Sequence, residues 1–305
     1  MRLSTRSIGV EVPEDFHFWS TVWSSGWCGL APFSFDEEER TLSRVQRLTS
    51  GKIVRATVRE ERKGLLRIRV ESREPLDEAD VEEVESVVGT CLRLDEDLSP
   101  FFEMIEGYPE FGWVREIGAG RSIRSPTVFE DMVKTISSTN CSWALTRAVT
   151  RRLCLRLGEP FSEEDHTFPT PRQVASATEG FIKAEIKAGY RSPYLVELAR
   201  KIVDEGLDVE AWRNSPLDSV SLKREVMKLR GVGDYAADNI LKLLGRYDFL
   251  ALDSWVRRKF SQIHGKGEAV SDREIEEFYA PFGKWKGLVL WLDMIKEHLV
   301  PKGRR

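Results

Sequence analysis

The sequence predicts an α+β fold in which an antiparallel-sheet domain, residues 1–122, precedes an all-helical domain, residues 123–305. Strand-like alternation of apolar and polar residues is confined to the first part of the chain, and no strand signal occurs after Ser125. Helical spacing interrupted by glycine stops fills the remainder. A chain of 305 residues exceeds one average domain, which also favours two domains.

The sheet is predicted from two neighbouring segments. Residues 52–60 and 65–72 each alternate apolar and polar side chains, and Lys63-Gly64 supplies the turn between them. We therefore expect two half-buried antiparallel strands. Residues 76–94 follow with valines at helical spacing and acidic residues in the first turn, where they suit the positive end of a helix.

The C-terminal part is predicted to be a series of helices separated by glycine and proline. Residues 125–158 hold one or two helices that stop at Gly158, and Pro281-Phe282-Gly283 interrupts the last helical stretch. The other expected helical pairs span residues 180–206, with a turn at Gly189, and residues 221–245, with a turn at Gly231-Val232-Gly233.

Cysteine and histidine usage argues against a metal centre and against a disulfide framework. The four cysteines and four histidines are scattered along the chain, and no two cysteines form a C-x-x-C pair. The sequence therefore predicts neither a zinc site nor an iron–sulfur cluster.

Charge is sorted along the chain, although the net value is only −4. Residues 147–156 contain four arginines and no acid; residues 222–260 contain nine basic and five acidic residues, a local excess of 9 − 5 = +4. The net charge argues against attraction of the whole molecule to nucleic acid, so any such contact is expected from these local surfaces.

The sequence also bears on location and source. No run approaches the ~20 apolar residues of a membrane helix, and the N-terminus lacks the apolar core of a signal peptide, so we expect a cytoplasmic protein. Three asparagines and three glutamines, beside abundant Glu, Arg and Lys, are typical of a thermophilic prokaryote.

The most informative local motif is LRGVGDYAADN, which begins at Leu229. Gly231 and Gly233 adopt backbone angles closed to other residues and leave the backbone N–H groups unobstructed. If a helix begins at Asp234, its free N–H groups form an anion site, and the basic residues just before the turn favour a nucleic-acid phosphate. A glycine turn that serves only to pack two helices explains the same residues.

Asp253 is a lone carboxylate in an apolar stretch, between Leu252 and Trp255-Val256. One interpretation is an N-cap for a helix that begins at Ser254. The other is a partly buried carboxylate facing a pocket, where it would stabilise a developing sugar cation or activate water, as in glycoside hydrolysis. The two roles are compatible.

Together, the glycine turn and Asp253 resemble the helix-hairpin-helix and Gly/Pro–Asp signature of the HhH-GPD DNA glycosylase superfamily. The segments FPTPRQVA, KAGYRSPYLVELARKI and PFGKWKGLVLW are similar to family segments in the same order. The N-terminal region resembles the TBP-like domain of the 3-methyladenine and 8-oxoguanine branches. The resemblance covers most of the chain, and the hairpin–aspartate pair is its most specific part.

The resemblance implies roles for individual residues. Asp253 matches the catalytic aspartate, and the amides of Gly231, Gly233 and Tyr235 match those that bind a DNA phosphate. No organic cofactor is implied. The backbone carbonyls that match those holding a monovalent cation, Na⁺ or K⁺, in relatives are those of Met227, Leu229 and Val232.

Tyr235 is a departure from the bifunctional members, which have a lysine at this position. Such a lysine forms a Schiff base with the sugar, and a phenol cannot. Only Lys223 or Lys228 could replace it, by reaching across the turn. We therefore expect a monofunctional enzyme that hydrolyses the glycosidic bond with water and lacks lyase activity.

An enzyme of this family flips the target nucleotide, which requires a plug for the duplex and a pocket for the base. Asn140 matches the plugging residue of relatives, with a helix cap as the alternative. Arg191 matches an arginine that contacts the opposite base, with a surface arginine as the alternative. The aromatic candidates for the pocket are Tyr235, Phe278, Phe282 and Trp285, each of which could instead belong to the core, Trp285 most of all.

The expected function is that of a monomeric, nucleoid-associated DNA glycosylase of base excision repair, acting on double-stranded DNA that contains a damaged purine. Alkylated adenine is the first choice of substrate. Oxidised and deaminated purines are alternatives, because Asn140 and Arg191 are typical of the 8-oxoguanine branch. The alternative from another class is a non-catalytic helix-hairpin-helix DNA-binding protein, which would have no need of a carboxylate at position 253.

Overall fold

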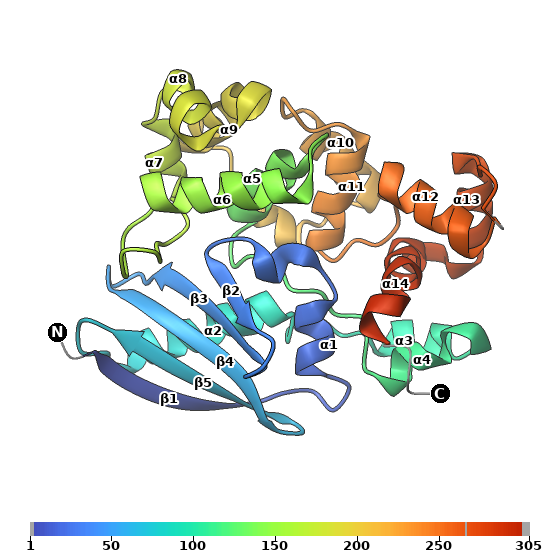
Figure 1. Ribbon diagram of the computed structural model, residues 1–305, viewed down its shortest axis with the longest axis horizontal. Helices are drawn as coiled ribbons and strands as arrows, with labels where there is room; N and C mark the ends of the chain where they lie inside the picture. The colour runs from blue at the N-terminus through green and yellow to red at the C-terminus, as the bar shows by residue number, and fades with distance from the viewer. Residues whose placement is uncertain (1–2, 266, 301–305) are drawn as a thin grey trace. The chain divides into compact units, whose positions relative to one another are not determined.

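The structure, a computed structural model, describes residues 3–265 and 267–300 (Figure 1). Its contacts divide the chain into two compact units, each built from two segments. Unit 1 comprises residues up to 95 together with 121–210, and unit 2 comprises 96–120 together with the residues from 211 onward. This division by contacts differs from the predicted domains 1–122 and 123–305, because helices from the middle of the chain pack with the sheet in unit 1.

The predicted α+β fold is confirmed. Unit 1 contains a five-stranded antiparallel sheet in the order β1-β5-β4-β3-β2, and helices follow it in the chain. The two predicted strands are β4 and β5, paired with Val58 opposite Ile68, and Gly64 has the left-handed backbone (φ 83°) that their turn requires. The strands span Ser4–Glu11 (β1), Phe33–Asp36 (β2), Thr41–Arg47 (β3), Ile53–Arg62 (β4) and Leu65–Ser72 (β5).

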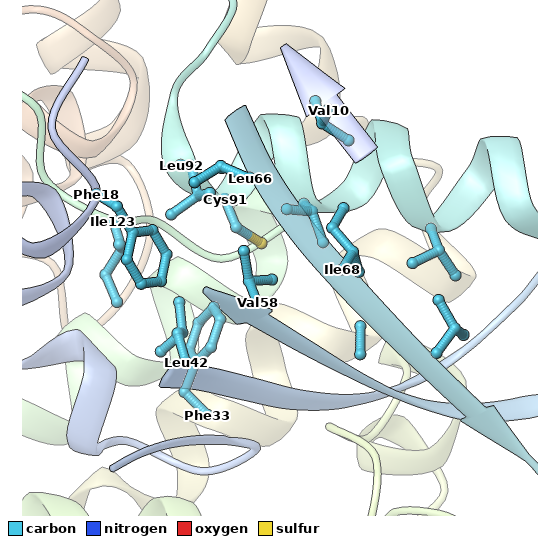
Figure 2. Packing of buried hydrophobic residues seen from close by; sticks show 14 of the residues in the cluster. Val10, Phe18, Phe33, Leu42, Val58, Leu66, Ile68, Cys91, Leu92 and Ile123 are labelled. Carbon is cyan, nitrogen blue, oxygen red and sulfur yellow. The ribbon is translucent and has the colours of Figure 1, made fainter. Parts of the chain in front are cut away.

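The sheet buries one face against helix α2, Glu78–Leu92, the predicted helix after the strands. Figure 2 shows the contact, with Leu42, Val58 and Ile68 from three strands pointing toward the helix side chains Cys91 and Leu92. A reciprocal capping box between Asp77 and Asp80 starts the helix. The remaining α-helices of unit 1 are α1 (Phe18–Trp23), α5 (Val128–Ser138), α6 (Trp143–Leu157), α7 (Pro171–Ala175), α8 (Glu179–Phe181) and α9 (Ser192–Asp204).

A buried ion cluster joins strand β3 to helix α5. Arg44 donates two hydrogen bonds to the Glu130 carboxylate, at 2.8 and 2.5 Å, and Lys134 donates a third at 2.6 Å. All three side chains are buried. Burial alone would raise the pKa of Glu130, but the charges of Arg44 and Lys134 lower it to about 2, so the carboxylate stays ionised.

Unit 2 is helical, and its core includes Phe111, Tyr247, Phe260 and Ile275. The predicted break at Pro281-Phe282-Gly283 is a 3₁₀ segment, Ala280–Trp285, in which Gly283 has φ 53°. Within the described residues, every helix is too short or too polar to cross a membrane. The α-helices are α3 (Ser99–Ile105), α4 (Gly112–Glu116), α10 (Ser219–Met227), α11 (Asp234–Leu243), α12 (Ser254–Ile263), α13 (Asp272–Tyr279) and α14 (Lys286–Leu299).

Candidate catalytic carboxylate and nucleic-acid interface

The predicted helical hairpin lies in unit 2, where α10 and α11 are joined by a short turn. The turn is closed by a hydrogen bond from the Val232 amide to the Leu229 carbonyl, at 3.1 Å. Gly231 has φ 87°, a conformation that glycine adopts without strain, as predicted. The prediction was wrong for Gly233, whose backbone is extended with φ −92°, an angle that any residue adopts.

The N-terminus of α11 is open to an incoming anion. Gly233 is its N-cap and supplies no side chain to occupy the first-turn amides. Gly233 is exposed, and a Cβ at this position would meet no atom within 4 Å. Backbone N–H groups at an uncapped, uncovered helix start are the donors that bind phosphate in many proteins.

Asp253 is the N-cap of α12 and is half-buried. Its Oδ1 accepts the Val256 amide at 2.7 Å, and the Arg257 amide donates to its backbone carbonyl at 3.0 Å. The other carboxylate oxygen has no hydrogen-bond or ion-pair partner among residues 3–265 and 267–300. The predicted cap is confirmed, and this cap fixes the carboxylate while leaving one oxygen for chemistry.

The lysines of the hairpin are engaged by carboxylates. Lys223 bonds Asp238 at 2.6 Å and Asp234 at 3.1 Å. Burial works to lower the pKa of Lys223, but the two carboxylates outweigh it and raise the pKa, so the amine is held protonated. Lys228 is exposed and pairs with Glu225 at 2.6 Å. A protonated amine is not a nucleophile, and Tyr235, in the first turn of α11, carries no amine at all.

Two of the predicted pocket aromatics are core residues. Phe282 is only 5% exposed and packs between Tyr108 and Phe111, with ring centroids 4.4 and 5.5 Å away. Trp285 stacks on Tyr247 at 5.6 Å in the same core. Both rings pack in the core, so the structure favours the core alternative for Phe282 as well as for Trp285.

The other two predicted aromatics remain accessible. Tyr235 is half-buried. Phe278, on α13, is 42% exposed and lies against His264, at 4.4 Å between ring centroids.

Two tryptophans near Asp253 were missed in the sequence. Trp255 follows the cap by two residues and is 42% exposed, and its ring lies 6.1 Å from that of Trp291 on α14. The Lys242 ammonium lies 4.3 Å from the Trp291 ring centroid. The sequence could have indicated Trp255. In α12 the buried residues are Val256 and Phe260, and Trp255 lies outside this apolar stripe. A large aromatic residue on the outer face of a helix often marks a binding surface.

Unit 1 holds the other predicted DNA contacts. Asn140 lies between α5 and α6, is exposed, and has a left-handed backbone with φ 46°. The N-cap of α6 is Ser142, so Asn140 does not cap that helix. It follows Thr139, the C-cap of α5, at the position where a left-handed residue commonly ends a helix. Asparagine tolerates a left-handed backbone better than most residues, so the loop presents this side chain with little strain.

Arg191 is buried, at 4% exposed, which excludes the surface-arginine alternative. Its Nε donates to the Thr139 carbonyl at 3.0 Å, next to Asn140. Tyr190 donates a hydrogen bond to the same carbonyl at 3.4 Å and is 52% exposed, with the Arg191 guanidinium 4.4 Å from its ring. Tyr190 and Arg191 thus contact each other and the backbone of the residue that precedes Asn140, and the sequence did not single out Tyr190.

The backbone carbonyls predicted to hold a cation belong to the hairpin. The Leu229 carbonyl accepts the Val232 amide and retains a second lone pair, and Met227 is partly exposed at 36%. Oxygen donors of this kind suit a hard monovalent cation. Among the described residues, no group of three or more histidine, cysteine or acidic side chains is arranged to hold a metal ion.

Comparisons with known proteins agree with this geometry. Residues 133–282 match the model of the HhH-GPD superfamily base excision DNA repair proteins. An N-glycosylase/DNA lyase of Saccharomyces cerevisiae is 26% identical over 159 residues, which cover 48% of this chain and 42% of that protein. The chain thus spans about two fifths of this relative's length.

Solved structures share the fold across nearly the whole chain. A 3-methyladenine DNA-glycosylase from Archaeoglobus fulgidus matches with a TM-score of 0.75 and 17% identity, covering 95% of this chain and 98% of the other. An 8-oxoguanine glycosylase/lyase of Clostridium acetobutylicum in complex with DNA matches with a TM-score of 0.70 and 19% identity, covering 98% and 99%. The resemblance predicted from the sequence is confirmed: residues 133–282, which include the hairpin and Asp253, match the HhH-GPD superfamily of base excision DNA repair proteins.

Proposed function

We propose that this protein is a DNA N-glycosylase of base excision repair that hydrolyses the glycosidic bond of a damaged purine. The observation that carries the proposal is the Asp253 carboxylate, which is fixed as an N-cap through one oxygen while the other is unengaged by any described residue. The names of the relatives, two glycosylase/lyases and one glycosylase, support the reaction class.

The proposed chemistry is hydrolytic. A flipped nucleotide places its anomeric carbon beside the free oxygen of Asp253, where the negative charge stabilises the positive charge that develops as the bond to the base breaks. Water adds to this carbon, its proton leaves to solvent, and the purine departs with the bonding electron pair and is protonated. The products are a free base and an abasic site.

Contacts with DNA are proposed for each unit by itself. The open amides of the hairpin bind a phosphate, and a Na⁺ or K⁺ ion on the carbonyls of Met227, Leu229 and Val232 would supply positive charge for the same phosphate. Asn140 and Tyr190 would fill the gap left by the flipped nucleotide, and Arg191 would face the opposite base. The partner is double-stranded DNA, and we propose a monomer.

We expect no lyase activity. Tyr235 replaces the Schiff-base lysine, and Lys223 is held protonated by Asp234 and Asp238. Borohydride treatment during turnover should therefore trap no protein–DNA adduct, and product strands should break only after alkali. The Tyr235→Lys variant, which places an amine at this position, is the matched comparison. A trapped protein–DNA adduct with the natural protein would overturn the proposal that the enzyme is monofunctional.

Trp255 and Trp291 are proposed as walls for the flipped base, in place of the buried Phe282. Stacking on an aromatic ring contributes about 1–3 kcal/mol per base, so Trp255→Ala should slow base release by roughly 10- to 100-fold. Binding to undamaged duplex should change little, because that binding needs no flipped base. Phe278→Ala tests the other accessible candidate in parallel, and a loss confined to that variant would assign the pocket to Phe278 and not to Trp255.

The class of lesion is tested by a duplex panel. Duplexes with alkylated, oxidised or deaminated purines are incubated with the protein, and released bases are identified by mass spectrometry. The sequence favours alkylated adenine, and Asn140 and Arg191 keep oxidised and deaminated purines in the panel. Binding without release from every duplex would leave the non-catalytic DNA-binding protein as the remaining function.

A further inference from the structure

A groove of about 460 Å³ lies within unit 1, beside helix α6. One wall is a face of α6 that presents Ala144, Arg147, Ala148 and Arg151. The opposite wall is formed by residues 29–34, where β2 begins, and by the loop 164–166. The two alanines keep the groove open, and the two arginines line it one helical turn apart.

The two groove arginines have no protein partner. Both are exposed, and neither guanidinium forms a hydrogen bond or ion pair with any residue in 3–265 or 267–300. A Cβ on Gly29 would lie 3.9 Å from the Arg147 Cδ, so the stem of this arginine lies against the opposite wall of the groove. By contrast, Arg156 at the end of the same helix pairs with Glu185 at 3.4 Å.

The opposite wall adds a polar atom without a partner. The Nδ1 atom of His166 is buried and finds no hydrogen-bond partner among the described residues. The neighbouring Asp165 is already engaged, by Arg55 and by the Ser162 hydroxyl. Glu164 is therefore the one unpaired carboxylate on the described lining, against the two arginines. With Asp165 neutralised by Arg55, two unpaired arginines face one unpaired carboxylate, and the buried Nδ1 of His166 is unsatisfied.

We propose that this groove binds phosphates of the DNA backbone, as a second contact beyond the hairpin. Guanidinium groups bind phosphate with paired N–H donors, and side chains one turn apart are about 5–6 Å from each other, close enough to contact neighbouring phosphates of one strand. The inference rests on the proposed function for the identity of DNA as the ligand.

The position along α6 supports this assignment. Helix α6 begins at Trp143, shortly after Asn140, and Arg147 and Arg151 follow Trp143 by 4 and 8 residues, roughly 6 and 12 Å along the helix. A DNA strand advances ~3.4 Å along the duplex axis per nucleotide, so the groove would meet the backbone a few nucleotides away from the flipped site. The contact adds affinity without reading sequence.

The test uses binding to undamaged duplex as a function of salt. Each phosphate contact contributes about one to the slope of log Kd against log salt, so Arg147→Gln and Arg151→Gln should each lower the slope by about one. Arg152→Gln is the matched control, because it removes the same charge from the same helix outside the groove. The Arg152→Gln variant should lower the slope of log Kd against log salt by less than either groove variant does.

Several results would overturn the proposal. An unchanged slope in both groove variants, or an equal fall in Arg152→Gln, would mean that the groove does not hold DNA phosphates. A second arm titrates inorganic phosphate and a mononucleotide by calorimetry. Tight binding of either, lost in Arg147→Gln while the DNA slope is unchanged, would assign the groove to a small phosphate ligand instead. Base release by the natural protein is measured separately, so failure of the glycosylase assignment and failure of the groove are distinguished.

Discussion

Replacement of Asp253 by asparagine should reduce base release by at least about 1,000-fold, the scale expected when a main electrostatic stabiliser of the transition state is removed. Asparagine caps helices about as well as aspartate does, so the α12 N-terminus and its bond to the Val256 amide should survive. The substitution therefore removes the charge and leaves the cap. DNA binding should change by less than a few fold, because the hairpin amides are untouched.

The measurements are single-turnover base release, duplex affinity and thermal unfolding of the same preparations. Asp218→Asn is the matched control, since Asp218 caps α10 through the Ser221 amide and lies outside the proposed site. Asp253→Ala, which loses the cap as well, should unfold with about 1 kcal/mol less stability. Normal turnover by Asp253→Asn would mean that Asp253 is only a cap.

The second large effect is expected on the stability of the fold and not on catalysis. Glu130→Gln leaves Arg44 and Lys134 as buried cations without a counter-charge, and breaking such a buried cluster costs about 3–5 kcal/mol. Glu159→Gln is the control, because it breaks the more exposed pair with Arg47 and should cost less than about 1 kcal/mol. Urea unfolding at neutral pH compares the variants, and a loss below 1 kcal/mol for Glu130→Gln would contradict the account.

The same cluster predicts an acid dependence. The pKa of Glu130 is lowered from 4.5 to about 2 in the folded state, so its stabilising effect is present above about pH 4.5 and is lost as the pH falls toward 2. The free energy of unfolding should fall by roughly 3 kcal/mol over this interval. This estimate follows because the pKa of Glu130 is lowered from 4.5 to about 2, and a difference of one in pKa corresponds to ~1.4 kcal/mol. Glu130→Gln should unfold with a weaker dependence on pH over this interval.

Local patterns were readable from the sequence. The strands β4 and β5 and helix α2 follow from alternation and helical spacing over a few residues, and the Asp253 cap follows from its position before an amphipathic helix. These features are fixed by neighbouring residues, which the sequence displays directly.

Features that depend on distant partners were not readable. Strand β3 carries Arg44 and Gln46 on its buried face, which hides the apolar alternation; Arg44 is tolerated there because Glu130 neutralises it from 86 residues away. Phe282 was expected in a pocket, but Tyr108 and Phe111 cover it from a segment about 170 residues earlier.

The candidate site shows the same division. The hairpin amides and Asp253 could be predicted because they are local features of the sequence. Trp255 became a candidate only in the structure, where its ring lies beside that of Trp291 on another helix. Tyr190 likewise became a candidate only when its hydroxyl was seen to bond the Thr139 carbonyl beside Asn140.

The most direct test of the central claim is a single-turnover assay that counts three products from one duplex of the most active lesion class: free base, intact abasic strand and cleaved strand. The account predicts that free base and intact abasic strand form in equal amounts, with cleavage only after alkali. Bound duplex with no free base would contradict the claim of catalysis, and strand cleavage that keeps pace with base release would contradict the claim that water is the nucleophile.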